Sequence, residues 1–163
     1  MKVHNPASVH PPAGNYSHGI ALPPNCRSLF VAGQTGMRAD GSTPAGFEEQ
    51  CDAAWQNLRA IVEDAGMQLT DIARLTVLLT DRANLPKFAE VRRRYLGDHK
   101  PASTGFVVAG LVRPEWLVEV DAIVLKPVAA PARKAAQKPA RRAAKRTGAA
   151  ARKAAKRPAR RRR

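Results

Sequence analysis

Charge is divided unevenly along this sequence of 163 residues, and the division limits what can fold. Residues 1–126 carry 13 basic and 13 acidic side chains, whereas residues 127–163 carry 15 Lys or Arg and no acid, so the net charge of +15 lies entirely in the second segment. That segment has 14 Ala and 4 Pro, and Val128 is its only large aliphatic side chain. It cannot bury enough apolar surface to offset the entropy of ordering its backbone, about 1–2 kcal/mol per residue. We therefore expect one folded domain over 1–126 and a disordered polybasic tail over 127–163.

The tail has the composition of a segment that binds polyanions. Each phosphate that a Lys or Arg neutralises releases counterions, which gives binding that is independent of base sequence and weakens with salt. The composition resembles the C-terminal tails of linker histones and bacterial histone-like proteins, and DNA or RNA is the expected partner. A purely solubilising tail and a membrane surface rich in anionic lipid are the alternatives, the second disfavoured because no apolar anchor accompanies the charges. The residues predicted to contact nucleic acid are Arg133, Lys134, Arg141, Arg142, Lys145, Arg146, Arg152, Lys153, Lys156 and Arg157.

Several classes of protein are not expected, because the sequence lacks their signals. No run approaches the roughly 18–20 apolar residues of a membrane span, and the N-terminal residues have no apolar stretch typical of a secretory signal. Two cysteines, Cys26 and Cys51, do not make a disulfide framework. No P-loop, dinucleotide-binding glycine motif or metal-ligand cluster is present. We expect a cytoplasmic chain with reduced thiols and no membrane partner.

Hydrophobic spacing in the first 126 residues changes between helix and strand periods. Apolar side chains recur at helical spacing over about 45–65, and Gly66 suits the end of that helix. A second, shorter helix is predicted with Asn84 as N-cap, Pro86 in its first turn and Gly97 as its stop. Alternating apolar and polar residues predict strands near 17–22, 28–33, 71–80, 104–111 and 116–125.

The resulting order, β-β-α-β-α-β-β, predicts an α+β domain with two helices on one face of a mixed sheet. The other face combines acidic residues such as Glu119 and Asp121 with apolar ones such as Leu117 and Ile123. Because this face is too apolar to be fully exposed, we expect a second copy of the chain to cover it. Clefts between subunits would then be lined by these strands.

Seven short strings of the domain stand in a characteristic order and spacing. They resemble the RidA/YjgF family of reactive-intermediate imine deaminases over about residues 5–126. The resemblance implies a chorismate-mutase-like fold, a homotrimer, and small-molecule ligands bound in clefts between subunits. Active members hydrolyse 2-imino or enamine acids to 2-keto acids and ammonia, with no metal or organic cofactor. The strings are NPAS (5–8), GNYSHGI (14–20), LFVAGQTG (29–36), NLRAIVEDAG (57–66), LTVLLTD (75–81), KPAST (100–104) and VEVDAI (118–123).

By this resemblance Tyr16, Gly33, Gln34 and Glu119 stand at site positions. Glu119 and Tyr16 would be catalytic, with Glu119 positioning or protonating through a water, as general acid–base catalysis requires. Gly33 and Gln34 would bind substrate, and the Gly33 backbone would approach the ligand closely, which a Cβ would hinder. The structural alternatives are that Tyr16 caps the first strand, that Gly33 is a bulge glycine, and that Glu119 pairs with Arg74 across the sheet.

The string PAST departs from the family pattern. Active members carry Arg where Ser103 stands in this sequence. The guanidinium of that Arg binds the substrate carboxylate. A hydroxyl offers one neutral donor in place of a bidentate charged pair, at a cost of roughly 1.5–3 kcal/mol. Ser103 and Thr104 are thus predicted substrate-binding residues in a deaminase of altered or reduced activity, with Arg74 or Arg113 as candidate substitute cations. The alternative is a non-catalytic trimer that binds a ligand or assembles on nucleic acid, and in either case the tail could place it at the nucleoid.

Overall fold

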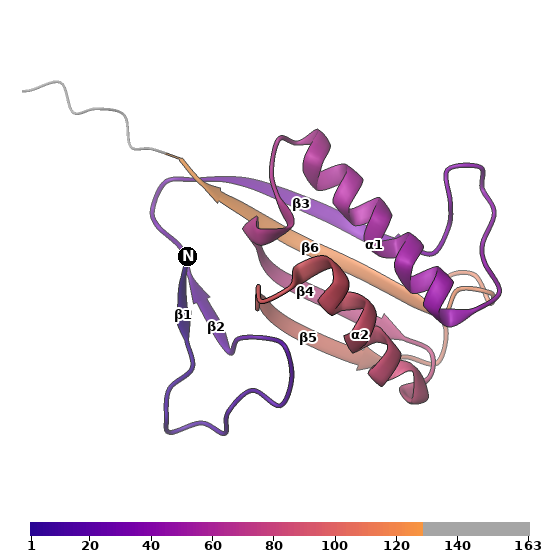
Figure 1. Ribbon diagram of the computed structural model, residues 1–163, viewed down its shortest axis with the longest axis horizontal. Coiled ribbons are helices and arrows are strands. Elements are labelled where there is room, and N and C mark those ends of the chain that lie inside the picture. Colours follow the sequence, from indigo (N-terminus) through magenta and orange to yellow (C-terminus); the bar gives the residue numbers. More distant parts are fainter. Residues whose placement is uncertain (129–163) are drawn as a thin grey trace, which may run out of the picture. The chain divides into compact units, whose positions relative to one another are not determined.

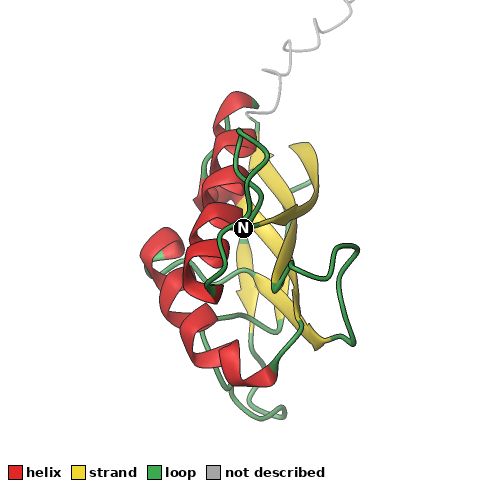
Figure 2. Ribbon diagram, turned by 90° about the vertical axis from the view of Figure 1, so that its right-hand side faces the viewer, coloured by secondary structure: helices red, strands yellow, loops and turns green. Residues whose placement is uncertain are grey.

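The computed structural model describes residues 1–128, which form a four-stranded sheet covered on one face by two helices. Figure 1 shows the sheet order β3-β6-β4-β5, in which β4 and β5 are parallel and the other neighbours antiparallel. Figure 2 shows both helices on the same side of the sheet. The prediction of an α+β fold with two helices on one face of a mixed sheet is confirmed. The elements are β3 (Cys26–Thr35), α1 (Phe47–Asp64), β4 (Ile72–Leu79), α2 (Leu85–Leu96), β5 (Ala102–Val107) and β6 (Val118–Pro127).

The helix boundaries follow from local signals in the sequence. Gly66, just beyond α1, has a φ of +66°, in the left-handed region that glycine adopts without strain. Pro86 lies in the first turn of α2 and Gly97 follows its end, both as predicted. Asn84 stands at the N-cap of α2, but its side chain makes no capping hydrogen bond. Asp81 is the capping side chain of the preceding 3-10 turn, η2 (Arg82–Asn84), where it accepts from the Ala83 N–H at 2.8 Å.

A single core fills the space between the sheet and the helices. The fully buried Trp55 of α1 stacks on Tyr95 of α2, with ring centroids 5.5 Å apart, and lies beside Phe88. The row Val118, Val120, Ala122 and Val124 faces this core from β6, as its alternation predicted. The helix α1 and the strand β6 are therefore joined by the apolar positions that their periodicities identify.

The strands at the end of the domain differ from the predicted ranges. β5 begins and ends earlier than expected, at residues 102–107 rather than 104–111, because a loop with Gly110 and Pro114 follows it. β6 begins at Val118 rather than at 116 and continues to Pro127. The Val128 N–H donates to Asn25 O at 3.0 Å. The first two residues assigned to the tail thus belong to the described domain, and the residues predicted to contact nucleic acid lie outside the described part of the chain.

A small second sheet was not foreseen. β1 (Lys2–His4) and β2 (Gly19–Ala21) pair antiparallel and form a sheet of their own, separate from the four-stranded one. The strand predicted at 17–22 is thus shorter and lies outside the four-stranded sheet. Three-residue strands carry too little alternation to be recognised in a sequence.

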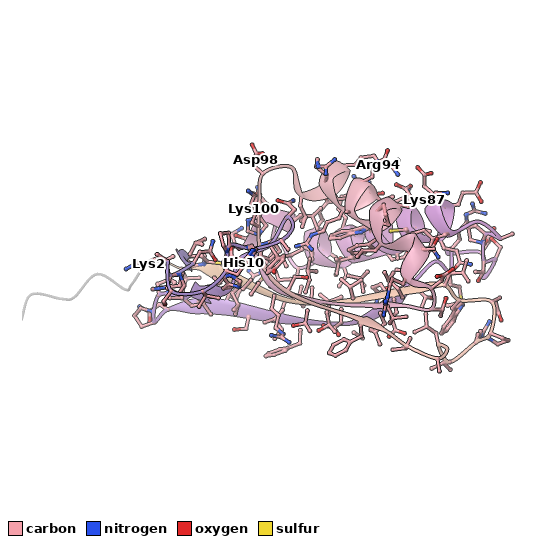
Figure 3. The ribbon with its side chains drawn as sticks, turned by 90° about the horizontal axis from the view of Figure 1, so that it is seen from below. Lys2, His10, Lys87, Arg94, Asp98 and Lys100 are labelled. Carbon is pink, nitrogen blue, oxygen red and sulfur yellow. The ribbon has the colours of Figure 1, made fainter. Side chains whose placement is uncertain are left out.

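The face of the four-stranded sheet opposite the helices is open in the single chain. Phe30 of β3 is 74% exposed and Phe106 of β5 is 51% exposed on it. Between them lie Glu119, Asp121 and Ile123 of β6, all partly exposed. In Figure 3 the helices lie above the sheet and strand side chains project below it without a covering helix. No helix among residues 1–128 is long and apolar enough to span a bilayer.

Candidate functional site

A groove of about 760 Å³ runs along the β5 edge of the sheet. One wall is the loop that precedes β2, another is α2, and the floor is β5 with part of β4; α2 and β5 lie side by side in Figure 1. Apolar side chains dominate the lining and a few polar ones converge on it, which is typical of small-molecule sites. We call it the edge groove. Its main lining side chains are Tyr16, Phe88, Arg92, Ser103, Thr104 and Phe106.

The loop that carries Tyr16 is fastened to the start of β5. The buried Ser17 hydroxyl donates to Lys100 O at 2.6 Å, and the Ser17 N–H donates to Pro101 O at 3.1 Å. The Tyr16 ring packs edge-on against His18, with centroids 5.8 Å apart. Tyr16 is therefore held at the edge groove by contacts of its neighbour Ser17 with a segment distant in sequence.

The only buried charged side chain among residues 1–128 lies in this groove. Arg92 of α2 is 7% exposed, and desolvation lowers its pKa to about 10, so the guanidinium remains protonated at neutral pH. Its Nη1 donates to Ser103 Oγ at 3.4 Å, a long contact, while Nε and Nη2 have no hydrogen-bond partner. Lys87 and Arg94, by contrast, project from the outer surface of the same helix (Figure 3).

Arg92 was not identified from the sequence, although a signal was present. It stands four residues after Phe88 and four before Leu96, and therefore on the buried stripe of α2. An arginine on such a stripe calls for an explanation, because Arg is almost never fully buried without a partner.

Arg74 and Arg113, the candidate substitutes for the missing carboxylate-binding arginine, lie outside the edge groove. Arg74 donates to Thr104 Oγ1 at 3.4 Å, and Arg113 lies over the Trp116 ring and near Glu115. Neither Arg74 nor Arg113 lines the edge groove.

A second group of predicted site residues lies where β3 changes register against β6. The shift falls between Val31 and Gln34. Within it, a Cβ on Gly33 would overlap the Glu119 carboxylate and stand 2.6 Å from Glu119 Cδ. The Gln34 amide donates to Ala32 O at 3.0 Å and to Gly33 O at 3.3 Å. The missing Cβ of Gly33 thus makes room for the Glu119 side chain, which would have to turn aside for any larger residue.

One chain does not bring all the predicted site residues together. Tyr16, Ser103 and Thr104 line the edge groove, whereas Gly33, Gln34 and Glu119 do not. The ion pairs found among the described residues do not include one between Glu119 and Arg74. The carboxylate is thus not engaged by the cation that the sequence offered as its partner.

The described residues give no support for a metal site or for a cysteine nucleophile. No three His, Cys, Asp or Glu side chains between residues 1 and 128 gather closely enough to hold a metal ion. Cys51 is fully buried, and desolvation raises its pKa to about 12. Since the thiolate is the nucleophilic form, Cys51 has the role of a small core residue, as its position on the helical stripe predicted.

Gly33→Ala is expected to lower the free energy of unfolding by about 1 kcal/mol, at the low end of the cost of forcing an extra methyl into occupied space, because the half-exposed Glu119 side chain can turn aside. The reason is the overlap of the new Cβ with Glu119. In the double variant Gly33→Ala/Glu119→Ala most of the loss should be recovered, because the obstructing atoms are gone. Urea unfolding measures all three. Gly105→Ala is the matched control, since a Cβ there meets open space; equal losses at both glycines would contradict the steric explanation.

Comparison with known proteins identifies the family to which the chain belongs. The sequence profile of the family described as Endoribonuclease L-PSP matches residues 7–126. The chain belongs to this Endoribonuclease L-PSP family. Among its relatives in curated sequences, a RutC family protein of Pyrococcus abyssi is 35% identical over 117 residues, 71% of this chain and 89% of the relative. The 2-iminobutanoate/2-iminopropanoate deaminase of Rattus norvegicus is 30% identical over 115 residues, 69% of this chain and 81% of the relative.

Solved structures of the Endoribonuclease L-PSP family agree with the fold. The Rid-family protein YyfB of Yersinia pestis superposes with a TM-score of 0.69 at 27% identity, over 76% of this chain and 96% of that one. The family resemblance of the seven sequence strings is thereby confirmed. The match covers the described domain and leaves the basic tail outside it.

Proposed function

We propose that the chain is a Rid-type hydrolase that converts 2-imino or enamine acids into 2-keto acids and ammonia, with a substrate preference or rate altered by Ser103. The observation that carries this is the edge groove: Tyr16 lies at its wall and a buried cation lies inside it. The groove occurs in a chain 30% identical to a 2-iminobutanoate/2-iminopropanoate deaminase. No metal or organic cofactor is needed for this reaction.

The complete site forms between two copies of the chain in a homotrimer. Two observations support this arrangement. Gly33, Gln34 and Glu119 do not line the groove in one chain, and the open sheet face that carries Glu119 also exposes Phe30 and Phe106. An exposed apolar face of this kind marks an interaction surface. Covering it with another copy brings Glu119 of one subunit toward the groove of the next.

The chemistry then needs only a water and two side chains. The water adds to C2 of the imine, and the tetrahedral intermediate loses ammonia to leave the 2-keto acid. Glu119, through that water, accepts a proton during the addition and returns one to the departing nitrogen. The Tyr16 hydroxyl donates a hydrogen bond to the reacting centre. An enamine substrate first takes a proton at C3 and enters as the imine.

The test generates the unstable substrate in place. An amino-acid oxidase makes 2-iminopropanoate from alanine, and semicarbazide traps whatever imine remains. The full chain should reduce the semicarbazone signal in proportion to its concentration, because it hydrolyses the imine to pyruvate before trapping. Boiled protein is the control. A folded, trimeric preparation that leaves trapping unchanged with both 2-iminopropanoate and 2-iminobutanoate would contradict the proposed reaction.

A second candidate function rests on the tail, with its 15 basic residues and no acid. Here the domain is an oligomerisation hub with or without catalysis, and three tails on one trimer bind DNA or RNA with high avidity. Such a protein would sit in the cytoplasm, associated with the nucleoid. The two functions are compatible, because the tail and the groove use different parts of the chain.

A further inference from the structure

The strongest unexplained feature of the domain is the charge of Arg92. Burying a guanidinium is unfavourable unless its donors are satisfied and its charge is paired. The side chain is 7% exposed, yet its one contact is the long bond to Ser103 Oγ. Nε and Nη2 lack partners, and no Asp or Glu lines the groove around it. Within one chain, no acidic side chain in the groove accounts for the buried charge.

The two unpaired nitrogens share one edge of the guanidinium. Nε and Nη2 point the same way because Nη1 is the nitrogen cis to Cδ, and Nη1 is the one that contacts Ser103. Two parallel N–H donors at this spacing match the two oxygens of a carboxylate, which gives the strongest geometry for that ion. Ser103 thus contacts Nη1 and leaves Nε and Nη2, both shielded from solvent in the single chain, without a partner.

We propose that Arg92 of α2 binds the substrate carboxylate in the edge groove, and so replaces from a helix the cation that Ser103 on β5 does not provide. The proposal rests on the proposed function for the identity of the anion, a 2-imino acid. The rest of the substrate then meets apolar side chains, Phe88 from α2 and Val77 from β4. The chain is thereby specific for small apolar 2-imino acids, held on the α2 side of the groove.

The decisive measurement is binding of pyruvate, the 2-keto acid product, to the full chain without turnover. Broadening of the pyruvate methyl signal in NMR titrations gives the dissociation constant. Arg92→Met should weaken pyruvate binding by tenfold to a hundredfold, the range for losing a charged hydrogen bond. Arg93→Met is the matched control, because Arg93 is exposed on the same helix and lies outside the groove; it should change binding less than twofold. Methyl pyruvate, which lacks the negative charge, should bind the unaltered chain as weakly as pyruvate binds the Arg92→Met variant.

Stability distinguishes this role from a structural one. Met keeps the length and apolar stem of Arg but removes an unpaired buried charge, so the melting temperature of Arg92→Met should stay the same or rise. Saturating pyruvate should raise the melting temperature of the unaltered chain and of Arg93→Met but leave that of Arg92→Met unchanged. A drop of several degrees in Arg92→Met would assign Arg92 to the fold and overturn the proposal.

Failure of this proposal is separable from failure of the proposed reaction. If the unaltered chain binds pyruvate through Arg92 but hydrolyses no imine, the result supports the carboxylate site and contradicts the proposed reaction. If the chain hydrolyses 2-iminopropanoate and Arg92→Met leaves KM unchanged, the reaction stands and the role of Arg92 is overturned. Absence of pyruvate binding to the unaltered chain, or equal binding by Arg92→Met, also overturns it.

Discussion

Replacing the ten predicted contact residues of the tail by Gln is expected to weaken binding to DNA and RNA by at least about 1000-fold at low salt. The substitutions run from Arg133 to Arg157 and leave 5 of the tail's 15 basic residues. The reason is the charge division: residues 1–126 have equal numbers of acids and bases, so little else on the chain attracts phosphates. Fluorescence anisotropy with a 30-nucleotide RNA and a 30-base-pair DNA measures the affinities in the full-length protein.

The salt dependence and a shuffled tail make this test specific. Affinity of the unaltered chain should fall steeply between about 50 and 200 mM salt, since each neutralised phosphate contributes to the slope. A tail with the same residues in shuffled order should bind equally well, because no fixed geometry reads the bases. An affinity insensitive to salt, or one retained by the Gln variant, would contradict binding through the charge of these ten residues. Because the family is described as an endoribonuclease, the length of the RNA is checked after each titration.

Glu119→Gln is expected to lower kcat for 2-iminopropanoate by about 100- to 10,000-fold with a small change in KM, the usual contribution of a general acid–base group. Gln keeps the size of the side chain beside Gly33 but cannot exchange a proton with the water. Asp121→Asn is the matched control, because Asp121 is the next acid on the same face of β6 and pairs with Thr76 of β4. The coupled oxidase assay gives kcat and KM for both variants.

The control variant Asp121→Asn distinguishes the loss of proton transfer by Glu119 from the loss of one negative charge. Both substitutions remove one negative charge from the same sheet face, so a general electrostatic effect would act on both. Melting temperature and oligomeric state are expected to stay the same in Glu119→Gln. A kcat within tenfold of the unaltered chain, or an equal loss in Asp121→Asn, would remove Glu119 from the mechanism.

Prediction from the sequence succeeded where the signal is local. The helix over 45–65 was recognisable because its apolar side chains repeat at helical spacing and Gly66 ends it. The inner row of β6 was recognisable from strict alternation. Where elements are short or irregular the same rules fail, as with β1 and β2, whose three residues each contain no periodicity.

Part of the candidate site was predictable from motifs rather than from periodicity. Motif matching named Tyr16, Gly33 and Glu119 because short strings keep their residues in order, yet it contains no distances. It therefore could not separate the groove residues from the group around Glu119. It also passed over Arg92, which lies in none of the seven strings.

By itself the sequence determined the helix over 45–65, the inner row of β6 and the division of charge between residues 1–126 and the basic residues that follow, since composition and periodicity depend only on neighbouring residues. Only the tertiary structure decided that Arg92 is buried without an acid, that Glu119 fills the space beside Gly33, and that Ser17 fastens the Tyr16 loop to β5. Each of these facts depends on the order and register of strands that pair across long stretches of chain. Desolvation and close contact arise only when such segments meet, and for this reason no local pattern encodes them.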